Sequence, residues 1–148
     1  MKLLFKPAYY WFTIFALTFI AYQLVQDTSR PNYYGNNLIV KYLLGIAPNF
    51  FPSIGIPALF VILIPELNKK NKTNKWFNNK KHITANIVSL IGLLTWEFLQ
   101  TTTTRGRFDW NDVIWTLIGA LIFQLIWTSA PLKYKEENEE TKYRNGSC

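Results

Sequence analysis

Long apolar runs separated by short polar segments dominate the chain. A helix of about 18 to 20 apolar residues, rising 1.5 Å per residue, crosses a hydrocarbon core of about 30 Å. The runs that reach this length are Ala8–Val25, Phe51–Leu67, Ile83–Gln100 and Asp112–Ala130. The pattern predicts an all-α, polytopic membrane protein with four transmembrane helices. We expect the first run to remain as an anchor, since it exceeds the 7 to 15 residues typical of a signal peptide.

The segment between the first two runs predicts a loop and an additional short helix. Gln26–Asn37 is polar and contains Pro31 and Gly35, which favours a loop. Leu38–Ala47 is apolar but carries a lysine and stops before a proline. Ten helical residues cover only about 15 Å, too little to cross the core. We therefore expect Leu38–Ala47 to form an interfacial or re-entrant helix.

Composition supports a membrane protein and excludes several classes. Of the 148 residues, 49% are hydrophobic and 17% aromatic. The net charge of +7 comes from lysines beside the apolar runs, not from lysines interleaved with aromatics, so no nucleic-acid partner is expected. The single cysteine, Cys148, allows no intramolecular disulfide and no thiol metal site. Phosphate-binding, dinucleotide-binding and zinc-binding spacings are missing, so no metal site is predicted and the sequence identifies no cofactor.

The distribution of basic residues predicts an orientation and two domains. Twelve of the 16 Lys and Arg residues fall in the N-terminus, the Lys69–Lys81 loop and the tail, which four spans place on one side. The positive-inside rule puts that side, with both termini, in the cytoplasm. Residues 1–132 are then a transmembrane domain that contacts the lipid bilayer, and residues 133–148 a charged cytoplasmic tail. The Lys69–Lys81 loop is expected to be a topology signal, and anionic lipid binding there is the alternative.

The hairpin between the last two spans carries the candidate functional residues. Ionisable groups beside membrane helices cost free energy, so they usually have partners or a purpose. Residues three or four apart share a helix face, which pairs Glu97 with Gln100 and Asp112 with Thr116. Asp112 also suits a helix N-cap, an equally good interpretation. The full candidate set is Glu97, Gln100, Arg105, Arg107, Asp109, Asp112 and Thr116.

Two chemistries remain open for this hairpin. Glu97 can form an ion pair with Arg105 or Arg107 that fixes the turn, since arginine holds a carboxylate by two hydrogen bonds. The hairpin offers no Cys or His for nucleophilic catalysis, which leaves carboxylate acid–base chemistry by Glu97 and Asp109. Catalytic residues are therefore unknown from the sequence.

The same stretch carries a family resemblance. Glu97-Phe98-Leu99-Gln100, then Arg105-Gly106-Arg107-Phe108-Asp109-Trp110-Asn111-Asp112, then Thr116-Leu117-Ile118-Gly119-Ala120 lie within residues 94–120. This run resembles the VanZ-like membrane proteins, whose pattern is a helix-ending acid and Gln, a Gly/Arg/Asp turn and a helix that opens with Asp. The resemblance implies four transmembrane helices, a bacterial inner or plasma membrane, and a link to glycopeptide (teicoplanin) resistance.

The function expected from this resemblance is an outer-face role in the cell envelope or in glycopeptide tolerance, with a lipid-linked envelope molecule as the partner. One alternative is an integral-membrane enzyme that acts on a lipid-linked or lipid headgroup substrate through the outer carboxylates. The other is a structural subunit of a larger membrane complex.

Overall fold

The computed structural model describes residues 7–71, 80–102 and 108–135, with the side chains of these ranges except residues 68–71. Every regular element in them is helical. In chain order they are α1 (Pro7–Gln23), the π-helical η1 (Leu24–Ser29), α2 (Arg30–Asn32), α3 (Leu38–Asn71), α5 (Lys81–Gln100), α6 (Trp110–Ser129) and α7 (Leu132–Lys135). Four stretches are long and apolar enough to cross a membrane, namely Pro7–Asn32, Leu38–Leu67, Lys81–Gln100 and Trp110–Ser129. The all-α class and the four candidate spans are thus confirmed.

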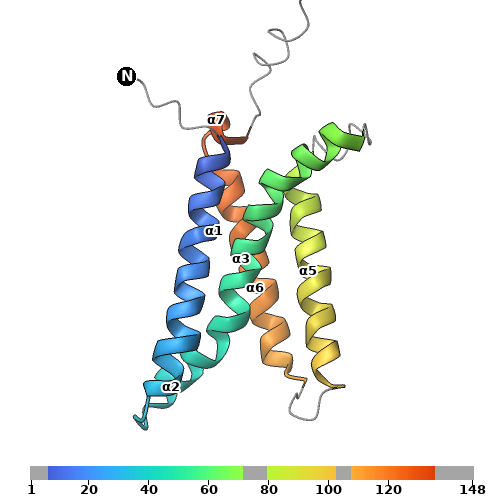
Figure 1. Ribbon diagram of the computed structural model, residues 1–148. Coiled ribbons are helices and arrows are strands. Elements are labelled where there is room, and N and C mark those ends of the chain that lie inside the picture. Colours follow the sequence, from blue (N-terminus) through green and yellow to red (C-terminus); the bar gives the residue numbers. More distant parts are fainter. Residues whose placement is uncertain (1–6, 72–79, 103–107, 136–148) are drawn as a thin grey trace, which may run out of the picture.

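The long helices alternate in direction and form a bundle around α3 (Figure 1). Helix α3 packs against α1, α5 and α6, and α5 also packs against α6. The start of α1 lies beside α7 at one end of the bundle, whereas α5 ends and α6 begins at the opposite end (Figure 1). The hairpin that holds the candidate residues is therefore remote from α7.

The expected interfacial or re-entrant helix at Leu38–Ala47 is wrong. These residues form the first part of α3, which continues through Pro48, Pro52, Pro57 and Pro65. Proline removes one helical hydrogen bond and clashes with the preceding turn, which costs about 3 kcal/mol, but its φ angle is helical and neighbouring helices compensate in membrane proteins. Burial of Ile54, Ala58 and Val61 between the other helices supplies that compensation here.

The predicted loop at Gln26–Asn37 is wrong over its first half. The helical path of α1 continues through η1 and α2 to Asn32, and Pro31 lies in the first turn of α2, where its missing N–H is least harmful. Only residues 33–37 separate α2 from α3. The boundaries of the last two spans agree with the sequence within two residues: α5 begins at Lys81 and ends at Gln100, and α6 runs from Trp110 to Ser129.

An aromatic core holds α1 and α6 together near α7. Trp11 is 1% exposed, and its ring stacks on that of Trp127 at 4.8 Å between centroids. Phe123 is fully buried and packs at 6.1 Å from Trp11. Large aromatic rings bury much apolar surface, and such pairs add about 0.5–1.5 kcal/mol beyond it. The buried core residues are Trp11, Ala58, Val61, Ala85, Phe123, Trp127 and Ala130.

The outer surface of the bundle is apolar. Leu17, Leu63, Ile91 and Leu121, one on each long helix, are all at least 40% exposed. Side chains of this kind on candidate spans face lipid in a membrane, where exposure to hydrocarbon costs nothing. The four helices therefore contact the lipid bilayer directly.

Candidate functional site

The candidate residues lie where α5 ends and α6 begins. Aromatic rings link the two helix ends there: Phe98 of α5 stacks on Phe108 at 5.3 Å, and Phe108 packs edge-to-face on Trp110 of α6 at 5.1 Å. These contacts place the last turn of α5 beside the first turn of α6. Glu97 and Asp112 therefore belong to one polar cluster, together with Asp109.

Asp109, not Asp112, caps α6. Asp109 has extended backbone angles (φ −123°, ψ 117°), and its side chain accepts a hydrogen bond from the Asn111 backbone N–H at 2.8 Å. This geometry defines an N-cap, which the helical Asp112 cannot adopt. The capping interpretation of Asp112 is wrong by one turn, and the Asp112 carboxylate is thereby available for contacts with other helices.

Glu97 is the most deeply buried acid of the cluster. Its side chain is 2% exposed, and its Oε1 accepts a hydrogen bond from Gln100 Nε2 at 3.3 Å. The predicted shared face of Glu97 and Gln100 is thus observed. The second carboxylate oxygen, Oε2, is buried and has no hydrogen-bond partner among the described residues. An unsatisfied buried carboxylate oxygen is costly, because ionised carboxylates normally accept several hydrogen bonds.

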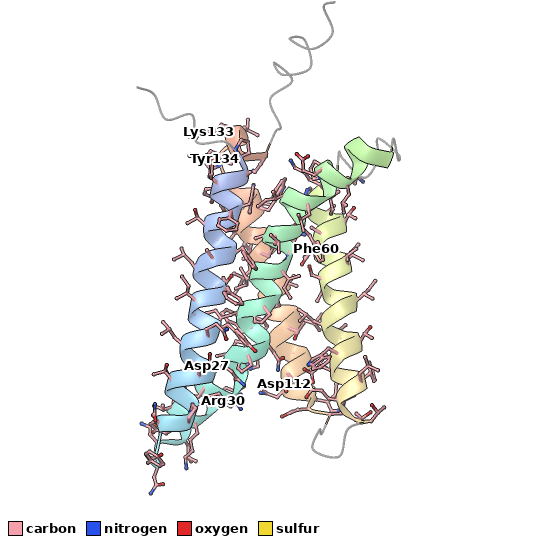
Figure 2. All side chains as sticks on the ribbon, in the orientation of Figure 1. Asp27, Arg30, Phe60, Asp112, Lys133 and Tyr134 are labelled. Carbon is pink, nitrogen blue, oxygen red and sulfur yellow. The ribbon has the colours of Figure 1, made fainter. Side chains whose placement is uncertain are left out.

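Asp112 is half-buried and faces α3. It accepts a hydrogen bond from the side chain of Asn49, in the first half of α3. The negative charges of Asp112 and Asp109 act on Glu97, so the three carboxylates repel one another. Arg30 attracts Asp112 from the α2 end, and Figure 2 shows both residues at the same end of the bundle. Arg30 is exposed and donates from Nη1 to Gln26 Oε1 at 2.9 Å.

Thr116 and Gly119 continue the buried face of α6 beyond Asp112. Thr116 is 1% exposed, one turn after Asp112 on the same face. A Cβ atom on Gly119 would collide with Ser53 Oγ and would lie 2.9 Å from the backbone oxygen of Phe50. The small residue at position 119 thus allows α6 to pack closely against α3, about two turns further along α6 than Asp112.

Arg105 and Arg107 lie outside the described residues, and so does their predicted ion pair with Glu97. That pair stays a prediction. Most of the Lys69–Lys81 loop and residues 136–148 of the predicted tail also lie outside them. In the described ranges, no group of three or more His, Cys, Asp and Glu residues is arranged to hold a metal ion.

Sequence reasoning missed the contribution of α3 to this end of the bundle. The Tyr42 hydroxyl donates to Asn111 Oδ1 at 3.0 Å and accepts from Trp115 Nε1 at 2.9 Å. Asn49, which bonds Asp112, was also overlooked. Asn49 is a polar residue within an apolar run, and this pattern could have identified it. The pattern can be recognised only when residues 38–67 are taken as one helix.

A polar stripe along α5 was missed as well. Asn86 is 8% exposed and Ser89 is 3% exposed, on the same face as Glu97. Asn86 Nδ2 donates to the backbone oxygen of Ala120 on α6 at 3.2 Å, while its Oδ1 is buried without a partner in the described ranges. One turn earlier, the His82 ring stacks on Trp127 at 4.6 Å. These polar residues are spaced three and four positions apart in an otherwise apolar helix, and this spacing could have indicated a shared face.

Fold and cluster together define a polytopic helical membrane protein with a polar site at one end of its bundle. The model of the Srw family, serpentine type 7TM GPCR chemoreceptors, matches residues 10–135 of the 148. The match covers most of the chain, and the chain belongs to this family. No curated protein and no solved structure matches the chain. The family description names seven spans, and the described part of this chain contains four candidates.

The family match corrects the expectations that came from the VanZ resemblance. That resemblance rested on residues 94–120, whereas the chemoreceptor model matches residues 10–135, which hold most of α1 and all of α3, α5 and α6. The expected roles in the cell envelope and in glycopeptide tolerance are wrong, and so are the alternatives of a lipid-modifying enzyme and of a structural subunit, because the family is one of chemoreceptors. The bacterial inner membrane is also wrong, because the family consists of nematode plasma-membrane receptors. The bilayer-spanning character stands.

Proposed function

We propose that this chain recognises a small chemical ligand as part of a serpentine chemoreceptor, and that the ligand binds at the polar cluster formed by Glu97, Asp109 and Asp112. The observation that carries the proposal is the buried Oε2 of Glu97, which has no partner among the described residues. Burying an unpaired carboxylate beside a membrane costs several kcal/mol, and such groups usually serve binding or transport.

Three further features of the cluster fit a ligand site. It receives side chains from α3, α5 and α6, so a bound molecule would bridge helices whose relative positions can respond to it. The three acids differ in exposure: Asp109 is exposed, Asp112 is half-buried and Glu97 is buried. A ligand that enters from solvent would therefore meet Asp109 before it reaches Glu97. Aromatic side chains border the cluster at Phe108 and Trp110, which gives an apolar wall beside the acids.

Lipid remains the second class of partner. Residues 69–81 hold six lysines, and anionic headgroups attract each such side chain by about 1 kcal/mol near a membrane surface. The end of α3 and the start of α5, which flank this segment, lie at the end of the bundle opposite to the acidic cluster (Figure 1), so such an interaction would anchor that end.

The test is ligand binding by the full chain reconstituted in lipid nanodiscs. A panel of small amines, alcohols, amides and carboxylic acids is screened by the shift in thermal unfolding, and hits are titrated. We expect at least one compound to bind the native protein about tenfold more tightly than Glu97→Gln or Asp112→Asn. Asp27→Asn is the control, because Asp27 is exposed at the same end of the bundle (Figure 2). Compounds that bind all four proteins equally, or no binding at all, would contradict the proposal.

A further inference from the structure

The acidic cluster contains more negative charge than its described neighbours compensate. Glu97, Asp109 and Asp112 repel one another. Among the described cations, Arg30 attracts Asp112, and its exposed side chain is bonded to Gln26. A positively charged ligand would relieve this repulsion. An anion would add to it, and a neutral molecule would leave it unchanged.

The geometry also specifies what the cation must offer. Among the described residues, Glu97 Oε2 has no donor. Asp112 accepts a hydrogen bond from Asn49, and a carboxylate has sites for about four. The cation must therefore carry N–H or O–H donors. A primary ammonium group has three donors and a single compact charge, which suits two carboxylates that repel each other.

A divalent metal ion fits less well. Calcium takes six to eight oxygen ligands and magnesium six in octahedral geometry. In the described ranges, no three acidic, His or Cys side chains are grouped closely enough to begin such a shell. An ammonium ion needs only two or three acceptors, and the cluster has these.

From these observations we infer that the site binds a small primary amine in its protonated form, with the ammonium group between Glu97 Oε2 and the Asp112 carboxylate. The exposed Asp109 attracts the cation toward the buried pair, since acids that line an approach raise the local concentration of cations. The inference rests on the proposed function of the same cluster and adds the chemical class of the ligand.

The test compares matched compounds on the full chain in nanodiscs at constant ionic strength. n-Butylammonium has both charge and N–H donors, n-butyltrimethylammonium has the charge without donors, and n-butanol has a donor without the charge. Sodium chloride is the inorganic cation control. We expect n-butylammonium to bind at least about tenfold more tightly than the other three, because a hydrogen bond to a charged group is worth about that factor or more. Asp109→Asn, which keeps the cap, should weaken binding less than Asp112→Asn.

The outcomes separate this inference from the proposed function. If n-butanol or n-butyltrimethylammonium binds as tightly as n-butylammonium, and Glu97→Gln still weakens binding, the ligand class is wrong while the site stands. If no compound shows a dependence on Glu97 and Asp112, the site itself is wrong. Asp112→Asn carries the same prediction should Glu97→Gln fail to fold.

Arg105 and Arg107 provide the decisive comparison. If one of them supplied the cation, Glu97→Gln and the arginine-to-Gln variant would show strongly non-additive losses of thermal stability without any amine, and n-butylammonium would bind only after the arginine is removed. That result would overturn the inference for the native protein. Additive losses, together with amine binding to the native chain, support it.

Discussion

Trp11 of α1 donates a hydrogen bond from its indole Nε1 to the backbone oxygen of Tyr134 at 2.8 Å, although the two residues are 123 positions apart. Tyr134 lies in α7, and its ring stacks on that of Tyr10 at 4.5 Å. Trp11 thus joins the beginning of the described chain to its end, while its ring packs on Trp127.

Trp11→Phe should lower the free energy of unfolding by about 1–3 kcal/mol, since it removes the hydrogen bond and part of the stacked area. Unfolding in mixed detergent and dodecyl sulfate micelles measures the loss. Trp96→Phe is the matched control, because Trp96 is 61% exposed and should tolerate the change. Equal effects at both positions would mean that α1 and α7 are not joined in this way.

Gly119→Ala should separate α3 from α6. The added Cβ would meet Ser53 Oγ and the Phe50 backbone oxygen, so one helix must shift, at a cost of about 1–3 kcal/mol. Gly92→Ala is the control, since a Cβ there meets nothing within 4 Å and alanine favours a helix by about 1 kcal/mol. Ser53→Ala should restore part of the loss, as the Phe50 contact remains. A Gly119→Ala variant as stable as Gly92→Ala would refute the close contact.

Asn86→Asp should be strongly destabilising. The ionised side chain no longer donates to the Ala120 oxygen, and it places a charge at a position that is 8% exposed within a membrane helix. The expected cost is about 2.5–3.5 kcal/mol. The same change at Asn37 is the control, because its Oδ1 accepts from the backbone of Ile39 at 2.9 Å and an aspartate keeps that role at the start of α3. Unfolding in micelles should then show a change below about 0.5 kcal/mol for Asn37→Asp.

Tyr42→Phe tests whether the first part of α3 docks on α6. The change removes the hydroxyl that joins Asn111 and Trp115, and we expect a loss of about 1 kcal/mol in unfolding free energy. Trp115→Phe should cost less in the Tyr42→Phe background than in the native protein, because both changes remove the same hydrogen bond. Tyr34→Phe, at an 88% exposed position, should have no effect. Additive losses for Tyr42 and Trp115 would mean that residues 38–47 do not contact α6.

The candidate site shows where sequence reasoning stops. Glu97 and Asp112 were identified because charged groups are rare at the ends of apolar runs, and the helix period placed Gln100 beside Glu97. Asn49 was not identified, since a single amide inside an apolar run gives no sign of its partner. The capping residue was assigned one turn too late, because cap formation depends on backbone angles that Asp109 adopts only in the folded hairpin.

The sequence by itself determined the four apolar helices and, for α5 and α6, their limits to within two residues, because bilayer thickness fixes the length of an apolar run almost independently of its neighbours. Only the tertiary structure decided that α3 continues through four prolines. Each proline has a local free-energy cost that favours a break in the helix. The packing of α3 against α1, α5 and α6 offsets this cost. Packing likewise decided which face of α5 is buried. Apolar runs carry little periodic signal, so the stripe of Asn86, Ser89 and Glu97 acquires its meaning from the helices that cover it.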